Sequence, residues 1–386
     1  MAQGLFPFHY ESASTSSGLT GRAGLPLYLE LASVAGFGRS VERHVRVAGK
    51  QGWTDEQCAQ ALMLLNLAGG DCMDDLDILE ADEGLGRLVR AAEDLGRSRS
   101  ERRRLRRRWR EERKRALPSP SVVGRWLEGF HDHEEEARRE AGKAFIPAAT
   151  EGLMGLRRGN ADLLAFASRH LRQKTATLDA DATLVGTTKD EALFCYKGFK
   201  AYQPLNVWWA EPGLMVHSEF RDGNVPAGFE KVRVVKEALA YLPPEVKKVY
   251  LRTDTAGYQA DLLKFCAKGE SERFGVIEFA ISADVTPAFK KAVAEVAADA
   301  WQPVPGTKDH EWAEVCFVPN WAGHSRKDPE YRFLAIREPL EQLSLPGVEQ
   351  PEKELPFQTL AFGAKGPCKL FGIVTNRTLP GSELIR

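Results

Sequence analysis

Two short acidic segments carry residues that could bind a divalent metal ion. They are Thr177-Leu-Asp179-Ala-Asp181-Ala-Thr183 and Leu251-Arg-Thr-Asp254-Thr-Ala-Gly257. Each is typical of a β-strand that runs into a turn, so each places a carboxylate at or near a strand end. Two carboxylates on neighbouring strands can hold Mg²⁺ or Mn²⁺ against a phosphate group. Chemistry of this kind normally requires a third acid.

The spacing of the first segment directs its two acids to one face of a strand. Alternate residues of a strand point to opposite faces, so Asp179 and Asp181 share a face, while Leu178 and Ala180 lie on the other. Either aspartate can therefore serve as the first ligand. Asp254 follows a predicted strand and is the second candidate, although an aspartate at a strand end also commonly caps a turn or helix.

Segment 97–115 is the strongest charge feature. It contains twelve Arg and Lys residues and three Glu residues, a local balance of +9. We predict a helix in which Leu105 and Trp109, four residues apart, form an apolar anchor on a cationic surface. Such a helix can follow a phosphate backbone, with an affinity that falls as salt rises. A solvated linker helix, neutralised by the acidic run 132–140, is the alternative.

The composition is that of an ordinary globular protein. The 386-residue chain has a net charge of −1, so any affinity for nucleic acid must come from local patches. The six cysteines form no CxxC pair, which argues against a zinc ribbon or a disulfide framework and favours a reducing cytoplasm. No apolar run of about eighteen residues indicates a membrane span, and the N-terminus lacks the features of a signal peptide.

The order of predicted elements indicates the fold. Residues 25–96 have helical patterns, and a short capped helix follows around Ser119-Pro-Ser-Val-Val-Gly-Arg-Trp126. From residue 175 the pattern alternates between strand and helix. Three strands in a meander, then helix, strand, helix and strand, is the order of a ribonuclease-H-like core of the retroviral-integrase superfamily. The predicted strands are 177–185, 202–209, 213–220, 248–253 and 274–281, and the predicted helices are 228–242 and 258–268.

The C-terminal part adds strands to this plan. A helix is predicted from Thr286-Pro287 to about residue 300. We interpret the first three strands after it as a β-rich insertion and the last as the return to the core. A helix with Ser382 as its cap then begins, and the sequence stops within its first turn, as expected for a chain truncated at its C-terminus. These four strands are predicted at 312–319, 331–337, 357–363 and 368–375.

Several motifs together resemble bacterial insertion-sequence transposases of the DDE class. More narrowly, the chain is similar to the insertion sequence thirteen-eighty family. The motifs are the two acidic segments, Lys197-Gly-Phe-Lys-Ala-Tyr-Gln-Pro-Leu205 and Tyr331-Arg-Phe-Leu-Ala-Ile-Arg-Glu338. The segment around Arg125-Trp126 resembles the helical region that precedes the catalytic domain of that family. The resemblance extends from about residue 10 to the end of the chain.

The resemblance implies cut-and-paste DNA transposition. It implies that two Mg²⁺ or Mn²⁺ ions, held by three acids, clamp the scissile phosphate and activate first a water and then a 3′-hydroxyl. Asp181, in its Asp-Ala-Thr context, matches the first ligand and Asp254 the second, with Asp179 as the alternative to Asp181. The third is a glutamate more than one turn into the last helix. Glu383 lies too early on that helix, so this acid is expected beyond Arg386, and Glu338 is the alternative.

The resemblance also implies the partners and the location. The partner is DNA, both the terminal inverted repeats of a mobile element and its target, and joining two ends implies a homodimer. The expected location is the bacterial cytoplasm, in association with the nucleoid. The candidate DNA contacts are Arg103, Arg107, Arg110, Arg125, Lys197, Lys200 and Arg252.

The resulting domain plan has four parts. Residues 1–125 form a helical DNA-binding region with the basic helix, and 126–285 form the first part of the catalytic core. Residues 286–365 form the β-rich insertion, and 366–386 return to the core. Two other functions stay open. One is a truncated, inactive protein that only binds DNA or inhibits an intact copy, and the other is a ribonuclease-H-like nuclease unrelated to transposition.

Overall fold

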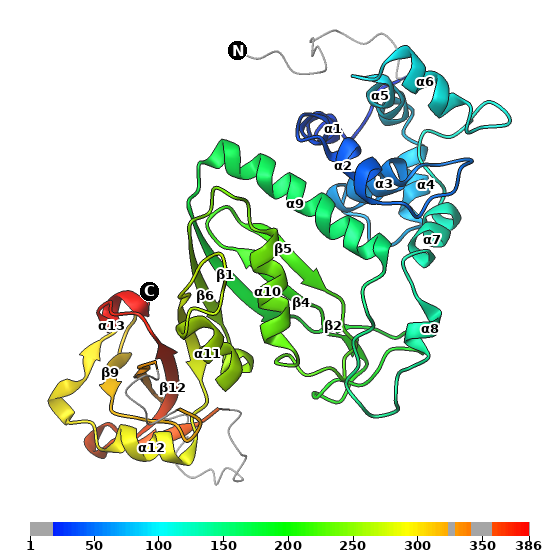
Figure 1. Cartoon of the computed structure of the whole chain (residues 1–386). Coiled ribbons are helices and arrows are strands. Elements are labelled where there is room, and N and C mark those ends of the chain that lie inside the picture. The colour runs from blue at the N-terminus through cyan, green and yellow to red at the C-terminus, as the bar shows by residue number, and fades with distance from the viewer. Residues whose placement is uncertain (1–17, 323–328, 341–356, 386) are drawn as a thin grey trace. The chain divides into compact units, whose positions relative to one another are not determined.

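The computed structural model describes residues 18–322, 329–340 and 357–385. The chain forms two compact units (Figure 1). Unit 1 comprises Met1–Ala141 and Phe145–Leu171, and unit 2 comprises Gly142–Ala144 and Arg172–Arg386. The predicted β-rich insertion includes residues 323–328 and 341–356, which lie outside the described residues. No helix within the described ranges has both the length and the apolar character needed to cross a membrane.

Unit 1 is helical, as the patterns over residues 25–96 predict. One apolar cluster is centred on Leu64, Leu76 and Leu85, and a second contains Trp126 and Phe130. Burial of these side chains is the main force that holds the short helices together. The helices are α1 (Leu25–Val34), α2 (Phe37–His44), α3 (Asp55–Leu67), α4 (Asp75–Glu80), α5 (Glu83–Asp94), α6 (Arg99–Arg106), α7 (Pro120–Glu128), α8 (His133–Glu136) and α9 (Glu151–Leu171).

The basic helix α6 is shorter than the sequence predicts. It begins at a capping box of Ser98 and Glu101 and ends at Arg106. The prediction that Leu105 and Trp109 share one helical side is therefore wrong. Trp109 instead packs edge-to-face on Trp53, with ring centroids 5.1 Å apart. This aromatic contact is non-local, so helical periodicity could not anticipate it.

Helix α9 is the longest helix described, with 21 residues, and the sequence patterns above do not indicate it. Its glycines lower helix propensity, and a packing requirement explains the one at Gly155. A Cβ added at Gly155 would lie 2.3 Å from the backbone oxygen of His44 on α2. Gly159, one turn later, has more room, since its added Cβ would lie 3.7 Å from Ser40 Oγ.

Alanine substitutions at these two glycines should have opposite effects. Gly155→Ala forces α2 and α9 apart and should lower the free energy of unfolding by about 1–3 kcal/mol. Gly159→Ala fits without a clash and should raise it by about 0.5–1 kcal/mol, because alanine loses less backbone entropy in a helix. Urea unfolding of the two variants, followed by circular dichroism, measures this difference. Equal midpoints for the two would contradict the close packing of α2 on α9.

Unit 2 is built on one ten-stranded mixed sheet with the order β5-β4-β1-β6-β7-β12-β10-β9-β8, in which β11 pairs with β12. Strand β4 is antiparallel to both of its neighbours, whereas β1, β6 and β7 run parallel. The strands of this sheet are β1 (Thr175–Ala182), β4 (Leu205–Trp209), β5 (Leu214–Glu219), β6 (Lys248–Thr253), β7 (Glu278–Ala283), β8 (Gln302–Pro303), β9 (Glu311–Val315), β10 (Arg332–Pro339), β11 (Thr359–Ala361) and β12 (Pro367–Thr375). Strands β2 (Val185–Gly186) and β3 (Ala201–Tyr202) form a separate pair.

The five predicted core strands are present, and β6 has its predicted bounds. The fifth, β7, begins four residues late, because Ser271 and Gly275 form a bridge that occupies the start of the predicted strand. The strands predicted as an insertion continue the same sheet, since β12 pairs with both β7 and β10.

Helices α10 (Lys231–Tyr241) and α11 (Ala260–Ala267) pack on the sheet, α10 against β5 and α11 against β7 (Figure 1). The buried residues of β1 include Leu178 and Ala180, while Asp179 and Asp181 on the other face are partly or fully exposed. The predicted alternation of β1 is thus confirmed. Two further helices are α12 (Pro287–Ala294), which ends before the predicted residue 300, and α13 (Gly381–Leu384), which has no side-chain cap from Ser382.

Candidate metal site

Asp181 and Asp254 lie side by side at the carboxyl ends of two adjacent parallel strands. The last register pair of β1 and β6 is Ala180 with Thr253, so the two aspartates are the next residues along these strands. Asp254 keeps an extended backbone, with φ −68° and ψ −172°. Residues at one level of a parallel pair point to the same face, about 4.8 Å apart. The fold therefore brings together the two acids that the sequence places 73 positions apart.

Asp179 lies on the same face of β1, but its carboxylate is already bound by an arginine. Its two carboxylate oxygens accept hydrogen bonds of 2.6 Å each from Nε and Nη2 of Arg252, its register partner on β6. Bidentate pairing of this kind is among the stronger charge-assisted interactions. Asp181, by contrast, is exposed and has no hydrogen bond or ion pair from its side chain to any described residue. The carboxylate available to a metal ion is that of Asp181.

The carboxylate of Asp254 is held by one oxygen. Its Oδ1 accepts hydrogen bonds from Lys231 Nζ at 3.2 Å, Ala256 N at 3.2 Å and Thr253 Oγ1 at 3.3 Å. The bond to Ala256 caps the short 3₁₀ turn Thr255–Gly257, so the cap function that the sequence also allowed is present. Oδ2 receives no hydrogen bond from the described part of the chain. One oxygen is fixed, and the other is free for a ligand.

Lys231 is the residue of this site that the sequence analysis missed. Its side chain is fully buried, and its ammonium also donates to Thr253 Oγ1 at 2.5 Å. Burial lowers the pKa of Lys231, and the nearby charges of Asp254 and Asp181 oppose that shift. A signal existed in the sequence. Lys231 lies on the buried stripe of α10 with Val234, Val235, Ala238 and Leu239, where a charged residue is out of place.

No third carboxylate joins the pair within the described ranges. The described His, Cys, Asp and Glu side chains contain one group whose ligand atoms all lie within 4.8 Å, and it does not include Asp181 or Asp254. Glu338 is on β10, three strands away from β6, or about 14 Å at the usual strand spacing. It contacts His310 and Lys369 instead. β7 is the next strand of the sheet after β6, and Asp284 directly follows its carboxyl end.

The group that does meet this distance is His217, Glu219 and Glu237, on β5 and α10. It does not fit a metal ion, because guanidinium groups already occupy it. Arg233 Nη1 lies 2.7 Å from both Glu219 Oε2 and Glu237 Oε1. Arg221, whose side chain is fully buried, lies 2.9 Å from Glu219 Oε1. This network is a structural set of ion pairs.

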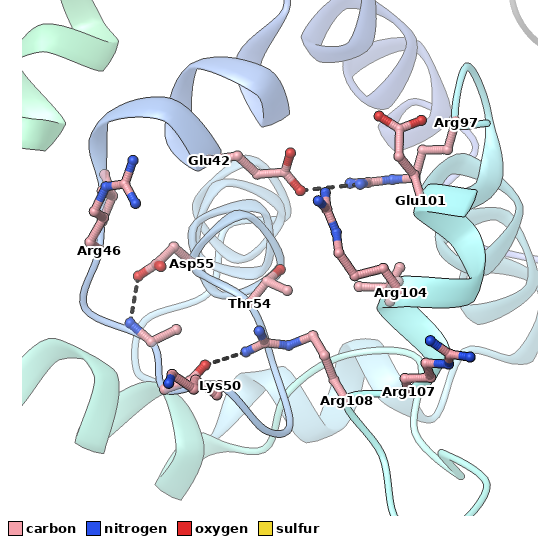
Figure 2. A pocket seen from close by; sticks show the side chains of 14 residues that line it. Glu42, Arg46, Lys50, Thr54, Asp55, Arg97, Glu101, Arg104, Arg107 and Arg108 are labelled. Carbon is pink, nitrogen blue, oxygen red and sulfur yellow. Dashed lines mark hydrogen bonds and ion pairs between the residues drawn. The ribbon is translucent and has the colours of Figure 1, made fainter. Parts of the chain in front are cut away.

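Unit 1 contains a separate basic pocket of about 650 Å³. Figure 2 shows Arg46 and Lys50, from the segment after α2, on one side of the pocket and Arg104 and Arg107 on another. These four side chains are exposed and form no ion pair or hydrogen bond with any residue in the described ranges. Two other cations in the lining serve the fold. Arg97 pairs with Glu42 and Glu56, and Arg108 donates to the carbonyls of Gly49, Gly52 and Trp53.

The lining carries six Arg and Lys side chains but three acids, Glu42, Asp55 and Glu101, so the pocket has an excess of positive charge. Asp55 Oδ1 accepts hydrogen bonds from Trp126 Nε1 and from the backbone of Val47 and Ala48. Glu101 accepts one from Ser98 N as part of the helix cap. The pocket therefore has the chemistry of an anion site.

The remaining predicted DNA contacts differ in availability. Arg103, Arg110 and Arg125 are exposed in unit 1, without side-chain partners among the described residues. In unit 2, Lys197 is exposed beside the ring of Tyr196, whereas Lys200 donates to the carbonyl of Asp190 at 2.9 Å. Arg252 is bound to Asp179, as described above.

An α/β fold with a large mixed β-sheet, and with a pair of acids at the ends of two adjacent strands, is consistent with a DDE transposase. A family model described as transposase DDE domain group 1 matches residues 12–324, which is most of the chain. The chain belongs to this family. This supports the DDE class expected from the sequence motifs.

Other comparisons are distant. A cryo-EM structure of the piggyBac transposase synaptic complex with hairpin DNA aligns with a TM-score of 0.33 and 12% sequence identity, over 91% of this chain and 52% of that chain. The chain thus spans about half the length of that transposase. No match was found among curated proteins.

Proposed function

We propose that this chain acts in cut-and-paste DNA transposition as a transposase of the insertion sequence thirteen-eighty type. It binds the ends of a mobile element and uses a divalent metal ion to cut DNA strands. The observation that carries this proposal is the pair of carboxylates, Asp181 and Asp254, at adjacent ends of β1 and β6. The order β5-β4-β1-β6-β7, with β4 antiparallel, supports a ribonuclease-H-like core around them.

The acid pair fits Mg²⁺ or Mn²⁺. Both ions prefer oxygen ligands, and Mg²⁺ is commonly bound by one or two carboxylates together with a substrate phosphate. Asp181 offers a carboxylate without a described partner, and Asp254 offers Oδ2. When bound, the ion would supply Lewis-acid activation of the phosphodiester and of the attacking water. Three hydrogen bonds to Oδ1 orient Asp254 for this role. Asp179 does not take part in metal binding, because its carboxylate is bound to Arg252.

Unit 1 supplies the DNA contacts in this proposal. A duplex carries a regular row of phosphates, and Arg or Lys side chains that neutralise them release counterions. The four unpaired cations of the basic pocket, together with Arg103, Arg110 and Arg125, form such a surface. Joining two element ends requires two such units, so we expect a homodimer in the complex with DNA.

Loss of the pocket cations should change the salt dependence of DNA binding. Each phosphate contact contributes a slope of about −0.9 in a plot of log K against log salt. The double variant Arg104→Ala/Arg107→Ala should therefore reduce the slope by about 2. The control is Arg87→Ala/Arg115→Ala, which removes the same charge from two arginines in ion pairs outside the pocket. Fluorescence anisotropy at several salt concentrations measures this. Equal slopes for the two variants would exclude the pocket as a phosphate site.

The central test is strand cleavage. DNA that carries the inverted repeats of the element, incubated with the protein and Mg²⁺, should be nicked at the element ends. EDTA should prevent this nicking. Failure to cut, with DNA binding retained, would favour the second candidate, a protein that occupies element ends without cutting them. One observation supports that candidate, since among the described residues no group of three acids with ligand atoms within 4.8 Å of one another contains Asp181 and Asp254.

A further inference from the structure

Lys231 is an unusual component of the acid site. Lysine is almost never fully buried unless it is paired, because its ammonium loses hydration. The other buried residues of α10, Val234, Val235, Ala238 and Leu239, are all apolar. The ammonium is instead directed to Thr253 Oγ1 and Asp254 Oδ1. A buried positive charge beside two proposed metal ligands requires an explanation beyond helix packing.

The contacts of Lys231 have two effects: they orient the carboxylate of Asp254, and they place a positive charge beside the acid pair. The hydrogen bond to Oδ1 fixes one oxygen of Asp254 and leaves Oδ2 without a described partner, so it orients the carboxylate. Orientation of the carboxylate favours metal binding, whereas the positive charge of the ammonium disfavours it. Two carboxylates alone carry two negative charges, and the ammonium reduces this to one. A cation within a few ångströms repels a divalent ion even where water partly screens the two charges, as it does beside the exposed Asp181.

We propose that Lys231 is a positioning residue and the fixed counter-ion of the acid pair. It holds Asp254 in place in the metal-free protein and lowers the affinity of Asp181 and Asp254 for a divalent cation. This inference rests on the proposed function, since it requires that the pair binds a metal. Because of Lys231, the protein without DNA binds a divalent ion more weakly than Asp181 and Asp254 would bind it without the lysine.

Binding of Mn²⁺ to the free protein tests this without any DNA cleavage. Titration of the full chain, followed by the electron paramagnetic resonance signal of free Mn²⁺, gives the dissociation constant. Lys231→Met should bind Mn²⁺ at least roughly tenfold more tightly than the wild type, because the repulsion is lost. Lys231→Arg keeps the charge and should bind within about threefold of the wild type.

The matched control is Lys236→Met on the same helix. Lys236 is exposed, its ammonium lies 4.8 Å from the centroid of the Phe265 ring, and it forms no ion pair with any acid in the described ranges. This variant should leave Mn²⁺ affinity unchanged. Lys231→Gln provides a second neutral variant with a polar end, so that a poorly folded methionine variant does not decide the outcome.

The possible results separate the two proposals. If Asp254→Asn binds Mn²⁺ as well as the wild type does, the proposed metal site is wrong. If binding depends on Asp254 but both neutral Lys231 variants bind equally or more weakly, the counter-ion inference alone is wrong. A residue with a purely structural function would produce that second pattern, because loss of orientation weakens a site and never tightens it.

Discussion

Asp181→Asn and Asp254→Asn should each reduce Mg²⁺-dependent cleavage of element-end DNA by about a thousandfold or more. Stabilisation by a metal ion of the charge that develops at the phosphate contributes several kcal/mol, and each 1.4 kcal/mol corresponds to about a factor of ten in rate. An asparagine keeps the shape of the side chain but provides a neutral, weaker ligand. Single-turnover cleavage with radiolabelled DNA measures the effect, and circular dichroism checks that each variant is folded.

Asp179→Asn is the matched comparison for this prediction. It makes the same chemical change two residues away on the same face of β1, but Asp179 is bound to Arg252 at 2.6 Å. Its cleavage rate should stay within about tenfold of the wild type. A loss as large as that of Asp181→Asn would show that Asp179 is a metal ligand and that its ion pair with Arg252 opens. Asp284→Asn belongs in the same series, because this acid follows the next strand, β7.

Glu219→Gln should have the largest effect on stability, a loss of about 3–5 kcal/mol in the free energy of unfolding. Glu219 is buried and is the carboxylate partner of Arg221, whose side chain is fully buried. It also pairs with Arg233. Removing the negative charge leaves a buried guanidinium without compensation, which is far more costly than the loss of an exposed pair. Urea unfolding monitored by tryptophan fluorescence provides the measurement.

Glu230→Gln is the control for this prediction. Glu230 contacts the same Arg233, at 2.7 Å, but its side chain is 47% exposed. Its loss should change the free energy of unfolding by about 1 kcal/mol or less. If the two variants unfold at the same urea concentration, the buried network around Glu219 does not carry the stability assigned to it.

The sequence predicted the elements of the acid site well, because they depend on local pattern. The alternation along Thr177–Ala182 placed Asp179 and Asp181 on one face, and the run Lys248–Thr253 gave the strand that delivers Asp254. The sequence was less successful where long-range contacts intervene. Helix α6 ends at Arg106 and Trp109 packs on Trp53, while α9 has a glycine at position 155 because α2 lies against it. Neither partner is close in sequence.

The sequence by itself determined the strands, their faces and the family motifs, since side-chain periodicity and strand-end turns are properties of neighbouring residues. The tertiary structure alone decided which acids can act together. The parallel register of β1 with β6 brings Asp181 next to Asp254, and Arg252 from the same strand pair engages Asp179. It also places the buried ammonium of Lys231 at Asp254. These relations join residues from 23 to 73 positions apart, and only pairing and packing bring such residues together.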